Sequence, residues 1–133
     1  IEKKLKLTIK KIFDQKGEQF FRNFEEKVAL EEIKKKNRVI SLGGGAFMNA
    51  KIRECVTLNA KSFWLHLDAD LLEKRLVNSK KRPLLVNKNI RINLEKIYKE
   101  RKSTYSLANY KIDCSNLTSN LIQKKIITLY END

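Results

Sequence analysis

The sequence is poor in the residues that build metal sites, disulfide scaffolds and membrane spans. Its 133 residues include two cysteines and one histidine, and Cys55 and Cys114 lie too far apart for a metal knuckle. No apolar run approaches the ~18 to 20 residues that a membrane-spanning helix needs, and no signal-peptide pattern opens the chain. We therefore expect a cytoplasmic protein with reduced thiols and no membrane partner.

Acidic residues are few compared with basic ones. The chain has 16 Asp and Glu against 29 Lys and Arg, which gives a formal net charge of +13. This excess is consistent with a lysine-rich composition bias, with small anionic ligands or with nucleic acid. The lysines are spread over every predicted helix and few aromatic residues stand among them, so the composition bias is favoured first and nucleic acid last.

Glycine and proline are also scarce, which makes their positions informative. The single proline lies in a basic, loop-like segment at about 78–89. Three of the four glycines stand together as Gly43-Gly44-Gly45, directly after an apolar pair at 39–40. A buried strand that opens into a loop without side chains lets the backbone approach a small ligand closely. In open α/β sheets, ligands bind just beyond the carboxyl ends of the strands.

Helix and strand signals alternate along the chain. Thr8 and Asn49 are predicted helix caps, Gly17 ends the first helix, and Asp70 opens a later helix through capping-box spacing. The predicted elements are helices at about 8–17 and 18–36, a strand at 38–42, a short helix from 49, a strand at 63–67, a helix from 70, a helix at 90–107, a strand at 110–113 and a last helix carrying Ile122, Ile126 and Leu129. This alternation predicts βαβ units and a parallel sheet within one α/β domain.

Five side chains are weighed as candidates for chemistry, and each has a plainer alternative. Arg22 and Glu25, at i and i+3, are either a surface ion pair or an arginine held so that it can grip an anion. Arg101 lies on the apolar stripe of its helix, where it either snorkels or meets an anion. Arg82 belongs either to a solvated loop or to a mobile lid over a phosphate. The lone His66 is typical of a satisfied residue in a core or at a strand end, since no metal-ligand partner stands near it in sequence.

In their order along the chain, these residues form four motifs. The motifs are Gly17-Glu18-Gln19-Phe20-Phe21-Arg22 with Glu25, then Ser41-Leu42-Gly43-Gly44-Gly45-Ala46, then Arg82-Pro83-Leu84-Leu85, and then Arg101 with Tyr105. This ordered set resembles the shikimate kinase family, whose pattern runs G-E-x-x-F-R-x-x-E, S-L-G-G-G or T-G-G-G, R-P-L-L and R-x-x-x-Y. The resemblance covers essentially the whole chain.

The resemblance implies a fold and an activity. Shikimate kinases have the P-loop nucleoside-monophosphate-kinase fold, a parallel sheet flanked by helices. They transfer the γ-phosphoryl group of ATP to the 3-hydroxyl of shikimate with Mg²⁺, in chorismate and aromatic amino acid biosynthesis. The implied partners are therefore shikimate and ATP, without nucleic acid or membrane, and the implied oligomeric state is a monomer.

The resemblance also implies roles for single residues. Arg22 and Arg101 would clamp the shikimate carboxylate, and Glu25 would hold Arg22. The backbone of Gly44, flanked by Gly43 and Gly45, would approach the ring hydroxyls. Arg82 would close on the ATP phosphates from a lid at about 78–89, and Ser41 would lie near the water shell of Mg²⁺. The shikimate-binding helices would span about 8–36.

One departure from the family pattern affects the expected activity. The family cradles phosphate with G-x-x-x-x-G-K-[ST], and this chain has no glycines that could build such a loop. The family's D-x-D segment is missing too, and the sequence at 113–117 differs from the family's adenine-side loop. We therefore expect residues 1–133 to be the C-terminal portion of a single shikimate-kinase-like domain, without its first strands and inactive alone. The alternatives are a related small-molecule kinase, such as a gluconate kinase, and a basic nucleic-acid-binding module.

Overall fold

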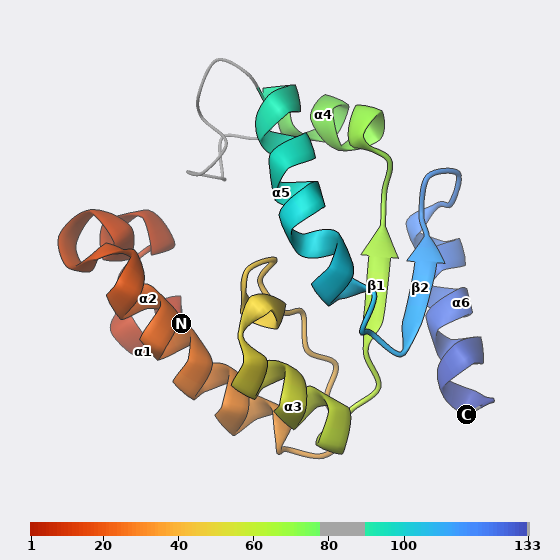
Figure 1. Ribbon diagram of the computed structural model, residues 1–133. Coiled ribbons are helices and arrows are strands. Elements are labelled where there is room, and N and C mark those ends of the chain that lie inside the picture. Colours follow the sequence, from red (N-terminus) through yellow and green to blue (C-terminus); the bar gives the residue numbers. More distant parts are fainter. Residues whose placement is uncertain (78–89, 133) are drawn as a thin grey trace. The chain divides into compact units, whose positions relative to one another are not determined.

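The protein was analysed as a computed structural model, which describes residues 1–77 and 90–132. These residues form two compact units, Ile1–Ala60 and Lys61–Asp133 (Figure 1). The first unit contains helices α1 (Glu2–Leu5), α2 (Ile9–Ile33) and α3 (Ala50–Asn59) and the short 3₁₀ helix η1 (Ala46–Met48). The second contains β1 (Phe63–His66), α4 (Ala69–Val77), α5 (Ile90–Tyr105), β2 (Tyr110–Asp113) and α6 (Ser119–Glu131).

Both predicted caps of the first unit are confirmed. Thr8 Oγ1 accepts a hydrogen bond from the backbone N–H of Lys11 at 3.3 Å. Asn49 Oδ1 accepts from the N–H groups of the second and third residues of α3, those of Lys51 at 2.9 Å and Ile52 at 3.2 Å. Each side chain therefore satisfies donors that a helix start leaves without a partner.

The predicted interruption at Gly17 is also confirmed. Gly17 has φ 79° and ψ 169°, so the backbone leaves the helical region in the middle of α2. Phe13 and Phe21 pack across the break with their ring centroids 4.7 Å apart. The second stretch of α2 ends at Ile33, earlier than the predicted Lys36.

The core of the first unit lies where α2, η1 and α3 meet. Its buried residues are Ala29, Ile33, Ala46, Ile52, Cys55 and Val56. Partly buried Leu30, Leu42 and Phe47 pack against them. Cys55 thus serves as a small apolar side chain, as its place on the helix predicts.

The predicted strand at 38–42 is wrong. This segment has no regular secondary structure, and Val39 is fully exposed. Two apolar residues favour a strand only where a neighbouring strand supplies ladder hydrogen bonds. The described residues of the first unit include no strand at all, so the segment runs without a ladder into the glycine loop.

In the second unit, both predicted strands form and pair in parallel. Phe63 lies opposite Tyr110, and His66 opposite Asp113. Because side chains alternate along a strand, one face of this pair carries Phe63 and Ile112 and the other carries Trp64 and His66. The first face packs against α6, with Ile112 fully buried, and Trp64 and His66 contact tyrosines of α5. The architecture is α/β, as predicted.

Two details of the second unit differ from the sequence prediction. Helix α4 begins at Ala69, with Leu72 N–H donating to Asp68 O at 2.9 Å, so Asp70 lies inside the first turn rather than at the cap. His66 ends β1 as expected, but its Nδ1 is buried without a hydrogen-bond partner among the described residues, while Nε2 lies 3.4 Å from Tyr98 Oη.

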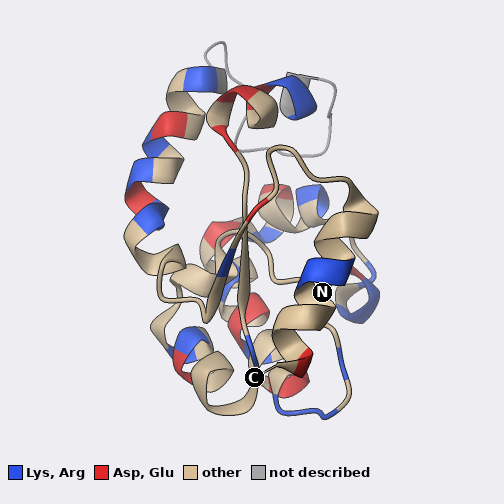
Figure 2. Ribbon diagram, turned by 90° about the vertical axis from the view of Figure 1, so that its right-hand side faces the viewer, with Lys and Arg blue, Asp and Glu red and all other residues tan. Residues whose placement is uncertain are grey.

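Charged residues are interleaved over the surface. Lys and Arg positions recur on helices of both units and alternate with Asp and Glu positions (Figure 2). In the described ranges 1–77 and 90–132, no helix is long and apolar enough to cross a membrane.

Candidate anion-binding site

The site is built around Arg22, which lies on α2 one turn after the break at Gly17. Its Nη1 donates to Glu25 Oε2 at 2.7 Å. Its Nε and Nη2 both donate to Glu18 Oε1, at 3.2 and 3.1 Å. The helix aligns these three side chains because positions i, i+3 and i+4 share one face. The pairing of Arg22 with Glu25 is confirmed, and it is more than a loose surface contact because the Glu25 side chain is only 10% exposed.

The protonated state of Arg22 is stabilised by its carboxylate partners. Burial by itself lowers the pKa of Arg22, but the hydrogen bonds and charges of Glu25 and Glu18 outweigh it, so the pKa is raised above its usual value. The guanidinium is also close to Phe21, with Cζ 5.1 Å from the ring centroid. Arg22 is thus a permanently charged group with fixed orientation at the edge of the core.

The glycine loop packs directly against this ion pair. A Cβ built on Gly45 would lie 2.6 Å from Arg22 Nη1 and 3.0 Å from Arg22 Cζ. A Cβ built on Gly43 would lie 2.9 Å from Glu25 Oε1. The loop turns here into η1 through a hydrogen bond from Ala46 N–H to Gly43 O at 2.9 Å. Gly43 and Gly45 are therefore required to leave room for the guanidinium and its carboxylate.

Gly44 and Ser41 are the remaining loop residues with predicted roles. Both are exposed, at the surface of the same loop. The structure thus brings Arg22, Glu25, Gly43 and Gly45 together and leaves Gly44 on the solvent side of that cluster. Among the described residues, no three His, Cys, Asp or Glu side chains converge on a point that could hold a metal ion.

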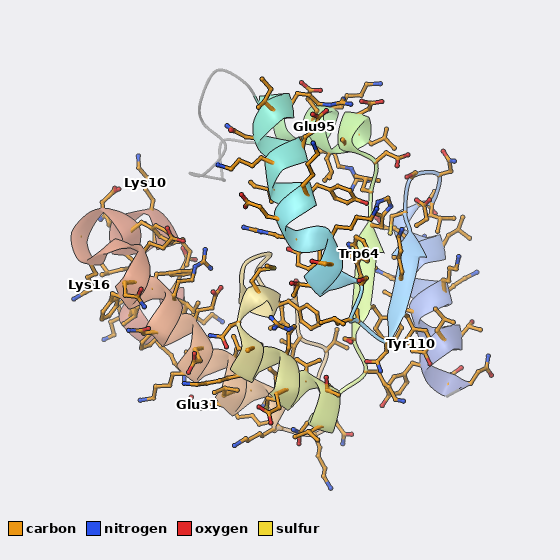
Figure 3. The ribbon with its side chains drawn as sticks, viewed as in Figure 1. Lys10, Lys16, Glu31, Trp64, Glu95 and Tyr110 are labelled. Atoms are coloured by element: carbon orange, nitrogen blue, oxygen red, sulfur yellow. The ribbon has the colours of Figure 1, made fainter. Side chains whose placement is uncertain are left out.

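Arg101 lies in the second unit, in the last turns of α5. It is half-buried, and its Nη1 lies 3.5 Å from Tyr105 Oη. The Tyr105 ring meets Trp64 of β1 edge-on, with 5.8 Å between centroids. Trp64 is labelled in Figure 3. Within 1–77 and 90–132, no carboxylate oxygen lies within 4.0 Å of the Arg101 guanidinium. Arg101 therefore differs from Arg22, whose charge is already matched by two carboxylates.

Arg82 and the segment 78–89 lie outside the described residues, so their proposed lid role stays a prediction. Glu18 is a site residue that sequence reasoning missed: it stands in the first motif without a predicted role, and the structure makes it the second partner of Arg22. Its spacing of four residues from Arg22 is the signal that could have identified it.

Comparison with known proteins connects this chain to one family. The family model described as shikimate kinase matches residues 1–131. The shikimate kinase of Bartonella quintana is 34% identical over 132 residues, covering 99% of this chain and 63% of that protein. That of Mesorhizobium japonicum is 32% identical over 127 residues, covering 96% of this chain and 63% of that protein. The chain thus spans somewhat less than two thirds of the length of these relatives.

Solved structures agree with the sequence matches. Shikimate kinase from Acinetobacter baumannii, in complex with shikimate, superposes with a TM-score of 0.89 at 32% identity, covering 99% of this chain and 75% of that one. Shikimate kinase from Bacteroides thetaiotaomicron superposes with a TM-score of 0.84 at 27% identity, covering 98% of this chain and 77% of that one. The motif order, the fold and these matches together show that the chain belongs to the shikimate kinase family.

Proposed function

We propose that this protein transfers the γ-phosphoryl group of ATP to the 3-hydroxyl of shikimate, and that residues 1–133 supply the acceptor side of the site. The observation that carries the proposal is the Arg22 guanidinium, fixed by Glu25 at 2.7 Å and seated against Gly45. A planar guanidinium in a fixed orientation binds a carboxylate through parallel N–H bonds. Shikimate carries one carboxylate on a ring of hydroxyl groups, which suits such a site.

In this proposal, different residues position different parts of shikimate. Arg22 and Arg101 clamp the carboxylate of shikimate, with Glu25 holding Arg22 in place. The exposed backbone of Gly44 approaches the ring hydroxyls. Phosphoryl transfer depends mainly on position and electrostatics, and correct positioning can contribute about 7–11 kcal/mol of barrier reduction. A carboxylate clamp would direct the 3-hydroxyl toward the γ-phosphorus.

The nucleotide side of the reaction needs groups beyond those described. Arg82, on the predicted lid at about 78–89, is proposed to neutralise charge on the ATP phosphates as arginine fingers do. No G-x-x-x-x-G-K-[ST] loop occurs in the 133 residues, so we expect residues 1–133 alone to show no turnover. We assign no Mg²⁺ ligand to the described residues, and Ser41 is proposed to contact only the water shell of that ion. The metal would neutralise phosphate charge when bound.

The proposal is tested by acceptor-dependent ATP consumption in the full-length protein. Shikimate is expected to be phosphorylated and gluconate not, since gluconate kinases need not carry both arginines. Arg22→Ala and Arg101→Ala are each expected to lower kcat/KM for shikimate by about 100-fold or more, which is about 2.7 kcal/mol. Arg38→Ala, which removes a surface arginine paired with Glu32 at 2.9 Å, is the matched control. Retention of kcat/KM within a few-fold in either site variant would overturn the assigned clamp.

The proposal extends to assembly and location. We propose a monomeric, cytoplasmic enzyme with one shikimate-kinase-like domain, whose partners are shikimate and ATP. The interleaving of acidic with basic positions (Figure 2) supports small anionic ligands over nucleic acid. A filter-binding titration with RNA and DNA is expected to show no steeply salt-dependent affinity.

A further inference from the structure

The two carboxylates that hold Arg22 are unequal. Glu25 accepts one short hydrogen bond of 2.7 Å, and its side chain is 10% exposed. Glu18 accepts two longer bonds through a single oxygen, and its side chain is 56% exposed. Glu25 is thus a buried anchor, held in place by the close approach of Gly43. Glu18 is a surface partner whose bonds are open to exchange with water.

The hydrogen bonds to Glu18 occupy the donors along one edge of the Arg22 guanidinium. Arginine offers five N–H donors, arranged as a side edge made of Nε and Nη2 and an end edge made of Nη1 and Nη2. Glu18 Oε1 accepts from both nitrogens of the side edge, at 3.2 and 3.1 Å. Glu25 takes one N–H of Nη1. Two of the five N–H groups are then left, one on Nη1 and one on Nη2.

The break in α2 places Glu18 where it can do this. Gly17, with φ 79°, makes Glu18 the first residue of the second helical stretch. An acidic residue in the first turn is favoured there by the free backbone N–H groups. One helical turn later, Arg22 reaches back to it. The Gly17-Glu18 pair therefore fixes both the start of this stretch and the orientation of its arginine.

We propose that Glu18 is a positioning residue that sets the direction from which Arg22 accepts the acceptor's carboxylate. By occupying the side edge, it leaves the remaining N–H of Nη1 and the remaining N–H of Nη2 as the place where an incoming carboxylate binds. Without Glu18, the guanidinium is free to bind the carboxylate by its side edge, which turns the substrate ring away from the productive direction. This inference rests on the proposed shikimate kinase function.

The test compares Glu18→Ala and Glu18→Gln in the full-length protein. Glu18→Ala is expected to lower kcat for shikimate about three- to tenfold without raising KM, because part of the bound substrate is then held through the side edge in a non-productive direction. KM for ATP is expected to stay unchanged. The Glu18→Gln side chain keeps an oxygen that accepts from both nitrogens, so it is expected to remain within twofold of the parent. Glu31→Ala is the matched control, since it removes another exposed carboxylate of α2, one that pairs with Lys4 (Figure 3).

Several results of these measurements would contradict the positioning role of Glu18. An unchanged kcat for shikimate in Glu18→Ala would overturn the inference, as would equal impairment in Glu18→Gln. Equal impairment in Glu31→Ala would show a general effect on the helix and would also overturn it. If Arg22→Ala lowers kcat/KM for shikimate while Glu18→Ala leaves kcat unchanged, only this inference fails. If Arg22→Ala has no effect either, the proposed function fails with it.

Discussion

Gly45 lies so close to Arg22 that a single methyl group does not fit between them. The Cβ of an alanine at this position would stand 2.6 Å from Arg22 Nη1, far inside van der Waals contact. Arg22 cannot easily move aside, because Glu25 and Glu18 hold three of its nitrogens. The absence of a Cβ at Gly45 is therefore needed for the position of the Arg22 guanidinium, independently of any ligand.

The first prediction concerns this contact. Gly45→Ala is expected to displace the Arg22 guanidinium and to raise KM for shikimate about tenfold or more, with a stability loss of about 1–3 kcal/mol from overpacking. Urea unfolding and steady-state kinetics measure the two effects separately. Ala50→Gly, one position into α3, is a control for backbone changes close to the loop. An unchanged KM for shikimate in Gly45→Ala would contradict the prediction.

The second prediction concerns the buried carboxylate. Glu25→Gln removes the charge that faces Arg22 at 2.7 Å while keeping the size of the side chain. We expect a stability loss of about 1–3 kcal/mol, the range for hydrogen bonds between charged groups. The midpoint of urea unfolding at neutral pH measures it. The exposed pair of Glu31 and Lys4 provides the comparison, and Glu31→Gln is expected to lower stability less than Glu25→Gln does, because solvent screens an exposed pair. Equal losses in the two variants would show that the burial of Glu25 does not matter.

The third prediction tests the break in α2. Gly17 adopts φ 79° and ψ 169°, and a Cβ there would meet no atom within 4 Å. Gly17→Ala therefore strains only the backbone, and we expect a loss of about 1–3 kcal/mol. Thermal unfolding measures it as a lower Tm. Gln15→Ala, at an exposed helical position two residues earlier, is expected to leave Tm nearly unchanged. A Tm of Gly17→Ala at or above the parent value would show that the chain does not need this conformation.

The fourth prediction concerns acid stability. Hydrogen bonds from Asn49 Nδ2 at 2.6 Å and Lys51 Nζ at 3.1 Å lower the pKa of Glu26 below its usual value. Because the folded pKa is below the unfolded one, near 4.3, the stabilisation is present above that pH and is lost as pH falls through the folded pKa. The free energy of unfolding is expected to fall less steeply below pH 4.3 in Glu26→Gln than in the parent. Parallel acid limbs for the two proteins would refute the assignment.

The fifth prediction concerns the catalytic activity of residues 1–133 on their own. Residues 1–133, purified free of host enzyme, are expected to show no shikimate-dependent ATP consumption, because the sequence has no G-x-x-x-x-G-K-[ST] loop to hold the phosphates. A coupled assay measures turnover, with the full-length protein as the positive control. Turnover by the 133-residue chain would show that the phosphates are held by another arrangement.

Local signals predicted most of the elements correctly. The caps at Thr8 and Asn49, the break at Gly17 and the strands at β1 and β2 follow from residues close together in sequence, whose effects need no distant partner. The strand predicted at 38–42 did not form, because strand structure depends on a neighbour that sequence pattern cannot supply. The place of His66 at a strand end was predictable from sequence, but the lack of a hydrogen-bond partner for its Nδ1 among the described residues depends on tertiary packing and was not.

For the site, the sequence by itself determined the residue types, their order and the pairing of Arg22 with Glu25, since helical spacing alone brings that pair together. Only the tertiary structure decided why the loop needs its glycines. Gly43 and Gly45 follow Glu25 and Arg22 by about twenty residues, and the packing of η1 and α3 on α2 brings the loop against them. The sequence pattern predicted only that the backbone of this loop contacts a ligand. The fold shows that two of its glycines are there because no Cβ fits beside an arginine and a carboxylate that are already held in place.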